Sequence, residues 1–314
     1  MDEKLRCCIC GDPVVPPCRI IGGRVYCERH YATVNQPNQG FWHAGIVQIL
    51  GVGIVTALIA FLAGQLGPLN PTVLIIVGVI LAIVPSAVWL YFFYRQDRLE
   101  PEPKTKLAEV FLLALLLTGA LGLPLINDWF RMRTWASAEG ITSLLASILI
   151  VGFTWQAIAY TAVRLVVYDT PEFDERMDGI VYGTVAGLGV ATLLNLNYVL
   201  ANGGVALGVG TIYVVTTALA QASFSGLLGY FMAEAKFEHK PVWWVPLGLF
   251  IAAVLNGLFI WLLSEVSATG LTVSPWRSLV LGMVVALAVF GLLLALMRRV
   301  LQETLAQPIV SSEQ

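Results

Sequence analysis

Four residues near the N-terminus have the types and the spacing of a metal site. Cys7 and Cys10 are separated by two residues, and Cys27 and His30 repeat that spacing after sixteen intervening residues. Three thiolates and one imidazole form a tetrahedral ligand set that suits Zn²⁺. Gly11 directly follows the first pair and suits the tight turn in which backbone N–H groups face the thiolates. The pattern therefore predicts one structural zinc ion held by Cys7, Cys10, Cys27 and His30.

The remaining cysteines leave the ligand set open. All five cysteines lie before residue 28, so Cys8 and Cys18 are alternative ligands, with Cys8 the closer rival of Cys7. A cytoplasmic location, argued below, disfavours disulfides and favours metal binding. The competing interpretation is a reduced, disordered cysteine-rich tail, and the spacing of both pairs argues against it.

The segment around these ligands resembles a half-LIM or zinc-ribbon module, over residues 7–31. Residues 20–27 read as a short hairpin that turns at Gly22 and Gly23. A unit this small has little core, so metal binding would supply most of its folding energy. A closed four-ligand site has no open coordination position, so we expect the module, residues 1–34, to contact another protein rather than to catalyse.

The rest of the chain has the composition of a membrane protein. Of all residues 58% are hydrophobic and only 12% are charged, where a soluble domain carries about 25% charged residues. The apolar runs of about 20 residues match the bilayer core, and helices satisfy their own backbone there. We therefore expect an all-α polytopic membrane protein of about eight transmembrane helices, at residues 44–66, 72–94, 107–126, 141–164, 179–200, 205–232, 242–263 and 276–297.

These spans set the expected domains and orientation. A linker over 35–43 would join the module to a membrane domain over 44–300, followed by a flexible tail over 301–314. Of the 18 Lys and Arg residues, only Arg131, Arg133 and Arg277 would lie on the far side of the membrane. Because basic residues concentrate on the cytoplasmic side, both termini are expected there, in the cell inner membrane.

Four carboxamide side chains lie deep inside the expected spans: Gln156, Asn195, Gln221 and Asn256. Polar groups are costly at that depth and are usually satisfied by a neighbouring helix. Two interpretations stay open. The amides are either a hydrogen-bonded knot that holds four helices together, or a pocket that binds a transmembrane segment or a small ligand.

Residues 91–263 resemble the PrsW family of polytopic intramembrane proteases. One loop carries the string Asp97-x-x-Glu100-Pro101-Glu102-Pro103. A second carries Pro-Glu-Phe-Asp-Glu-Arg-Met-Asp-Gly at 171–179, where Asp178 is a candidate helix N-cap, and Gly-Leu-Gly follows at 187–189. The resemblance implies a PrsW-like membrane domain.

The same resemblance implies acidic and histidine residues that this chain lacks. Active members carry Glu-Glu-x-x-Lys before the second loop, a Glu-Asn pair after it and two later histidines. Asn195 is retained from the Glu-Asn pair, and the expected lysine falls at Tyr160. The five expected acid and histidine positions fall at Gln156, Ala157, Leu194, Gln221 and Asn256.

These replacements remove the groups that peptide hydrolysis requires. Hydrolysis needs a general base for water or a metal ion that lowers the pKa of the water. Carboxamides neither accept a proton near neutral pH nor bind Zn²⁺ well. None of the three histidines (His30, His43, His239) lies inside an expected span.

We therefore interpret the chain as a catalytically inactive homologue of this family. It would bind membrane-embedded partners such as a single-span protein, while the zinc module contacts a cytoplasmic protein. Two alternatives stay open. One is an active peptidase that uses Glu172, Asp174 or Glu175 and cleaves membrane-tethered regulators such as anti-sigma factors; the other is a small-molecule transporter. No nucleic-acid partner is expected.

Overall fold

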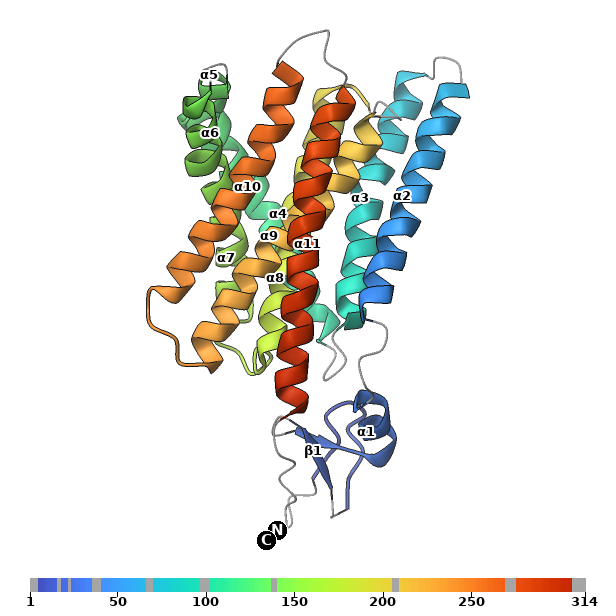
Figure 1. Cartoon of the computed structure of the whole chain (residues 1–314), viewed down its shortest axis with the longest axis vertical. Coiled ribbons are helices and arrows are strands. Elements are labelled where there is room, and N and C mark those ends of the chain that lie inside the picture. The colour runs from blue at the N-terminus through green and yellow to red at the C-terminus, as the bar shows by residue number, and fades with distance from the viewer. Residues whose placement is uncertain are drawn as a thin grey trace.

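A computed structural model of the chain shows a bundle of long helices with a small module beyond one end (Figure 1). It describes residues 5–15, 18–21, 24–35, 41–65, 70–96, 102–136, 140–204, 209–268 and 275–306. The bundle consists of α2 Phe41–Gln65, α3 Pro71–Gln96, α4 Lys104–Leu117, η1 Thr118–Gly122, η2 Leu125–Trp129, α5 Met132–Ala136, α6 Ile141–Ala146, η3 Ser147–Gly152, α7 Phe153–Val166, α8 Arg176–Ala201, α9 Val209–Phe237, α10 Trp244–Ala268 and α11 Pro275–Leu305.

The all-α membrane fold is confirmed. Seven stretches of the described residues are long and apolar enough to cross a membrane: Pro71–Arg95, Lys104–Trp129, Ile141–Val166, Arg176–Ala201, Gly210–Phe237, Trp244–Leu263 and Met283–Leu305. They coincide with seven of the eight expected spans. The first expected span corresponds to α2, a continuous helix of 25 residues with an apolar described stretch at His43–Val55.

α8 lies at the centre of the bundle because glycines let α9 approach its backbone. A Cβ atom added at Gly179 would lie 2.3 Å from the carbonyl oxygen of Gly229. Added at Gly183 or Gly187, it would lie 2.4 Å from Ser225 O or 2.3 Å from Gln221 O. Two helix backbones can approach this closely only where the residue at the contact is glycine or has a very small side chain. This packing places the peptide group of Gln221 directly against α8.

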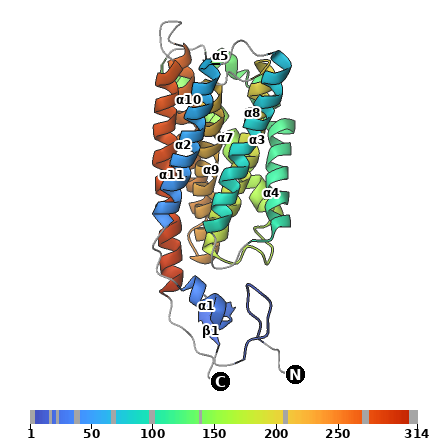
Figure 2. The ribbon, with the colours of Figure 1, turned by 90° about the vertical axis from the view of Figure 1, so that its right-hand side faces the viewer.

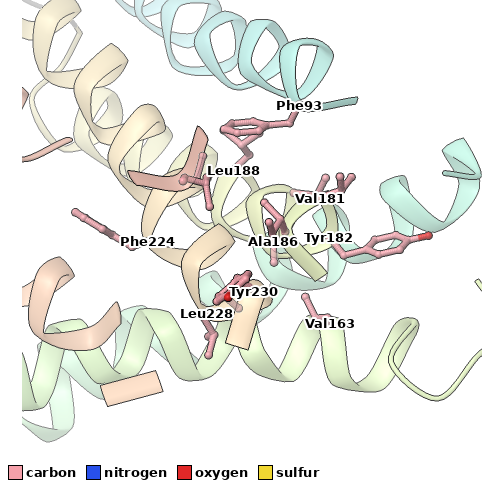
Figure 3. Close-up of a cluster of buried hydrophobic side chains, with 14 of the residues drawn as sticks. Phe93, Val163, Val181, Tyr182, Ala186, Leu188, Phe224, Leu228 and Tyr230 are labelled. Carbon is pink, nitrogen blue, oxygen red and sulfur yellow. The ribbon is translucent and has the colours of Figure 1, made fainter. Parts of the chain in front are cut away.

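Large side chains fill the space around this contact. Figure 3 shows Val181, Tyr182 and Leu188 of α8 among buried neighbours from other helices. Beside them, Trp89 and Phe93 of α3 are fully buried in an aromatic cluster whose ring centroids lie 5.2 to 6.5 Å apart. Edge-to-face ring pairs at this separation stabilise the fold beyond the effect of the area that they bury.

The module has a hairpin and one short helix. β1 Arg19–Ile21 pairs antiparallel with β2 Arg24–Tyr26, with Ile21 opposite Arg24. α1 follows at Glu28–Val34. The expected hairpin is confirmed, although Gly22 and Gly23 lie outside the described residues. The module lies at the end of the bundle where α11 finishes (Figures 1 and 2).

Ion pairs attach the module to the membrane domain. Arg24 of β2 pairs with Asp174 and with Glu175, the latter at 3.0 Å between Nη1 and Oε2. The Arg24 and Glu175 side chains are 14% and 13% exposed, so water screens this pair less than a surface pair. The hairpin is thereby held against the loop that precedes α8.

Two expected segment bounds differ from the structure. α2 begins at Phe41, inside the expected linker 35–43, of which residues 36–40 lie outside the described part. α11 continues to Leu305, into the expected flexible tail 301–314. Val300 and Leu301 are buried, and Glu303 accepts hydrogen bonds from Arg176 of α8 and from Arg299. These contacts extend the helix beyond the expected span 276–297.

The start of α8 also differs from the expected one. The N-cap is Glu175, not Asp178, and Asp178 occupies the third helical position of a capping box. Its Oδ2 accepts hydrogen bonds from the backbone N–H groups of Asp174 and Glu175, at 2.8 and 2.7 Å. The buried carboxylate satisfies donors that the first turn of a helix leaves unpaired.

Candidate functional site

The four predicted metal ligands lie together in the module. The Sγ atoms of Cys7, Cys10 and Cys27 and a ring nitrogen of His30 all lie within 4.8 Å of one another. Nδ1 of His30 is 3.5 Å from Cys7 Sγ and 3.2 Å from Cys27 Sγ, and the Sγ atoms of Cys10 and Cys27 are 4.0 Å apart. Zinc bond lengths imply about 3.5 Å between sulfur and nitrogen and about 3.8 Å between two sulfurs in a tetrahedron. The donor set fits a Zn²⁺ ion with little rearrangement.

The local backbone favours the thiolate form of Cys7, whereas hydrogen bonds to Asp12, Cys7 and Cys27 and desolvation raise the pKa of Cys10 to about 12. Gly11 has a φ of +70°, as the expected turn requires, and its N–H donates to Cys7 O at 2.8 Å. Burial of the Cys7 thiol opposes ionisation, but N–H groups of Cys27, Cys10 and Ile9, together with His30, lower its pKa to about 6. The thiolate is the form that binds metal.

Cys8 and Cys18, the alternative ligands, lie outside this group. The backbone N–H of Cys8 instead donates to Val25 O at 2.9 Å, which fixes the N-terminal segment on the hairpin. Cys18 is buried directly before β1.

A reciprocal amide pair joins two helices inside the membrane domain. Nε2 of Gln221 in α9 donates to Oδ1 of Asn256 in α10 at 3.1 Å. Nδ2 of Asn256 donates back to Oε1 of Gln221 at 2.9 Å. Both side chains are at most 1% exposed. Beside Asn256, Gly257 lets α10 approach η3, because a Cβ there would lie 2.3 Å from Ile148 Cα.

The other two predicted amides also join helices. Oγ of Ser225 in α9 donates to Oε1 of Gln156 in α7 at 3.2 Å. Nδ2 of Asn195 in α8 donates to the backbone oxygen of Val214 in α9 at 3.0 Å. The hydrogen-bonded knot therefore exists as three separate links, all to α9. Nε2 of Gln156 and Oδ1 of Asn195 are buried and form no hydrogen bond with the described residues.

A cavity of about 320 Å³ lies beside the amide pair. Gln221 and Leu194 are the predicted positions that line it, and its other walls include Trp155 and Phe259. Ala157 is exposed on the outer side of α7 and takes no part in the cavity. The expected Glu-Glu-x-x-Lys pattern placed one residue earlier, at 155, 156 and 159, would have all its positions buried. The sequence analysis missed Trp155 because a single sequence does not determine which side of α7 faces the cavity.

Three acidic residues of the two loops, Asp174, Glu175 and Glu102, have structural partners. Asp174 and Glu175 pair with Arg24, as described above. Glu102 is buried and accepts a hydrogen bond from Tyr182 of α8. Asp97, Glu100 and Pro101 of the first loop lie outside the described residues.

The two sites have different chemical capacities. Within the described residues, the His, Cys and acidic groups close enough to share a metal ion are those of the N-terminal cluster. The intramembrane site offers carboxamides and apolar walls. Carboxamides donate and accept hydrogen bonds but do not transfer protons near neutral pH.

Comparison with known proteins matches most of the membrane domain. Residues 102–295 match a family described as PrsW family intramembrane metalloprotease. The chain is 31% identical over 192 residues to Protease PrsW of Geobacillus kaustophilus, covering 58% of this chain and 77% of the relative. It is 27% identical over 187 residues to Protease PrsW of Bacillus subtilis, covering 59% and 82%. No solved structure gives a significant match. The module and α3 lie before the family match.

Proposed function

The chain belongs to the PrsW family of intramembrane metalloproteases, and we propose that it is a member that binds membrane-embedded polypeptide segments without hydrolysing them. The observation that carries this proposal is the reciprocal pair of Gln221 and Asn256. It stands at two positions where the family resemblance leads us to expect histidines. Each amide satisfies the other, so the pair needs no ion and no proton transfer.

The residues of the intramembrane site do not fit a catalytic metal. Zn²⁺ at a hydrolytic site takes imidazole, carboxylate or thiolate ligands and keeps one position open for water. Gln156, Leu194, Gln221 and Asn256 supply none of these groups. Metal-activated hydrolysis at this cavity therefore lacks its ligands in this chain.

The cavity suits side chains of a passing helix rather than a whole helix. Its volume of about 320 Å³ is at the lower end of the roughly 300–1,000 Å³ range of ligand pockets. Gln221 retains one amide N–H and further acceptor capacity beyond its pairing with Asn256. We propose that a transmembrane segment inserts an apolar or uncharged polar side chain here.

The module adds a second contact at the proposed cytoplasmic side. We propose that Cys7, Cys10, Cys27 and His30 hold one structural Zn²⁺ in a half-LIM-like unit. Binding would fix the hairpin, and Arg24 would then hold the unit on the loop before α8. With this orientation both termini lie in the cytoplasm, and the exposed side of the module is free to bind a protein.

An active peptidase is the alternative, since the curated relatives are named proteases. It would have to use acidic residues outside the cavity. Asp174 and Glu175 are engaged by Arg24, and Asp178 caps α8. Recruiting Asp174 or Glu175 would break the ion pairs with the module, and recruiting Asp178 would break the capping of α8. Glu172, the remaining acid of this alternative, is half-buried in the same loop.

A photo-crosslinking experiment tests binding and cleavage together. The full chain would be reconstituted in vesicles with single-span proteins and would carry p-benzoylphenylalanine at Leu194, which lines the cavity. We expect crosslinks to the intact single-span protein and no cleavage product. The matched control carries the same group at Leu116, which is 62% exposed on α4, and should capture much less protein.

Cleavage would contradict the proposal. If wild-type protein released fragments of the single-span protein and Gln221→Ala abolished that release, the chain would be an enzyme that uses this site. Equal capture at Leu194 and Leu116 would remove the evidence for a binding cavity.

A further inference from the structure

A second hollow is lined by residues of α3 and α4, two helices whose ribbons are neighbours in Figure 2. Its volume is about 490 Å³, and it shares no lining residue with the amide cavity. Both helices lie against α8 and leave a furrow between them. Ser86 of α3 accepts a hydrogen bond from Thr192 of α8 at 2.8 Å. A Cβ added at Gly189 of α8 would lie 2.4 Å from the backbone oxygen of Phe111 in α4.

The furrow is apolar along its length and basic at one end. Leu90, Phe111 and Leu112 form part of its walls, and Lys104 lies at its end. Leu112 is 53% exposed, so the furrow opens toward the surrounding bilayer. Lys104 forms no ion pair with any described residue. Lys106, two residues further along, is instead paired with Glu109 at 2.8 Å.

Further groups at this end favour an anion. Lys104 is the first residue of α4, whose N-cap Pro103 provides no side-chain hydrogen bond. The first N–H groups of a helix have no partner within the helix, and the helix dipole is positive there. Tyr94 lines the furrow, and tyrosine is enriched where apolar and polar membrane layers meet. An ammonium group and uncapped N–H groups together suit a phosphate.

The dimensions select an acyl chain as the occupant. Along α3 the furrow extends from Ile83 to Tyr94, about 16 Å at 1.5 Å per residue. One leaflet contributes half of a hydrocarbon core of about 30 Å, so this depth corresponds to a single lipid leaflet. We infer that the furrow between α3 and α4 binds one acyl chain of an anionic phospholipid, with its phosphate at Lys104.

Native mass spectrometry of the full chain tests this inference. The protein would be reconstituted in nanodiscs containing phosphatidylglycerol and phosphatidylcholine, and its bound lipids counted after release. We expect retained phosphatidylglycerol, and about fivefold weaker retention in Lys104→Gln, from the usual contribution of one surface lysine to anionic-lipid binding. Lys106→Gln removes the same charge from the same helix and should change retention little.

A second pair of variants tests the acyl chain. Ala108→Trp would fill the furrow, where Ala108 forms part of the wall, and should reduce retention of both lipids. Leu116→Trp places the same ring elsewhere on the exposed side of α4 and should not. Melting of each variant in detergent verifies that it is folded, and Lys104→Gln remains informative if Ala108→Trp does not fold.

Three results would overturn the inference. Phosphatidylglycerol and phosphatidylcholine could be retained equally by the wild type and by Lys104→Gln. Inorganic phosphate could displace the bound lipid without any effect of filling the furrow, which would indicate a headgroup site alone. A photo-crosslinker at Leu112 could capture a polypeptide rather than lipid, which would make the furrow a helix contact.

Discussion

Replacing Gly187 by alanine tests how closely the fold and the candidate site depend on each other. The added Cβ would lie 2.3 Å from Gln221 O and 2.7 Å from Gln221 C. Both atoms are backbone atoms of α9, so no side-chain rotation relieves the contact. To reach an ordinary contact of 3.4 Å or more, α8 and α9 must separate by about 1 Å at this level.

The magnitude follows from two opposing contributions. Overpacking of a closely packed interface costs about 1–3 kcal/mol. Removing a glycine from a helix interior returns at most about 1 kcal/mol. With that gain subtracted, the net loss relative to the wild type is up to about 2 kcal/mol, or a fall in the melting temperature of up to roughly 8 °C for a chain of this size. Relative to a glycine-to-alanine change that meets no atom, the loss is the full cost of about 1–3 kcal/mol.

Gly291 provides the matched control. It lies in α11, and a Cβ added there would meet no atom within 4 Å. Gly291→Ala should leave the melting temperature unchanged or raise it slightly, since only the gain in helix propensity remains.

Thermal unfolding in detergent, followed by the fluorescence of the nine tryptophans, measures both variants. Crosslinking at Leu194 provides the second readout, because a displaced Gln221 should also reduce capture of a single-span protein. If Gly187→Ala melts at or above the temperature of Gly291→Ala, the close contact of α8 with α9 is wrong. The positioning of Gln221 by that contact would then be wrong as well.

Three further predictions concern the metal cluster, the module contact and the amide pair. Cys10→Ser should abolish binding of one zinc ion per chain, whereas Cys18→Ser should retain it, as measured by metal analysis of purified protein. Zinc binding should weaken as the pH falls, because protons compete with the metal for the thiolates. Arg24→Ala should increase hydrogen exchange in the module and in residues 173–178, because the ion pairs that join them are lost. Gln221→Leu should lower stability by about 1–2 kcal/mol, since it leaves the Asn256 amide buried and unpaired, and adding Asn256→Leu should recover part of that loss.

The controls for these three predictions are also present in the chain. Arg19→Ala removes an exposed arginine whose distance to Glu28 is 3.8 Å, so it should change exchange far less than Arg24→Ala. Two bound metal ions per chain would contradict the assignment of all metal binding to the module. For the amide pair, additive losses in the single and double variants would show that the two side chains do not interact.

Local patterns in the sequence were sufficient to predict much of this structure. Length and apolarity located the membrane helices, because a bilayer imposes both on any spanning helix. Small residues one turn apart on a membrane helix favour close packing, and Gly183 and Gly187 of α8 contact the backbone of α9. The cysteine spacing predicted that Cys7 and Cys10 lie beside Cys27 and His30. This was possible because residues near in sequence determine the geometry of the loop and the hairpin.

The remaining features depend on contacts between distant residues. The rotation of α7 decides that Trp155 lines the cavity and Ala157 does not, and the neighbouring helices set that rotation. The extension of α11 depends on Glu303 meeting Arg176, which is 127 residues away in the chain. The attachment of Arg24 to the loop before α8 is likewise a contact over 150 residues. No periodicity or spacing in a single sequence encodes such pairs.

The loop that carries the family resemblance has a structural explanation in this chain. Glu175 and Asp178 form the capping box that begins α8, and Tyr182, one turn later, donates to buried Glu102 of the first loop. Phe173 is buried among aromatic rings, stacked on Phe237 of α9 at 5.9 Å. These contacts fix the start of α8 whether or not a reaction occurs at the cavity. The family motif and the catalytic residues are therefore separable, because one determines how α8 enters the bundle and the others would act at the cavity deeper in the membrane.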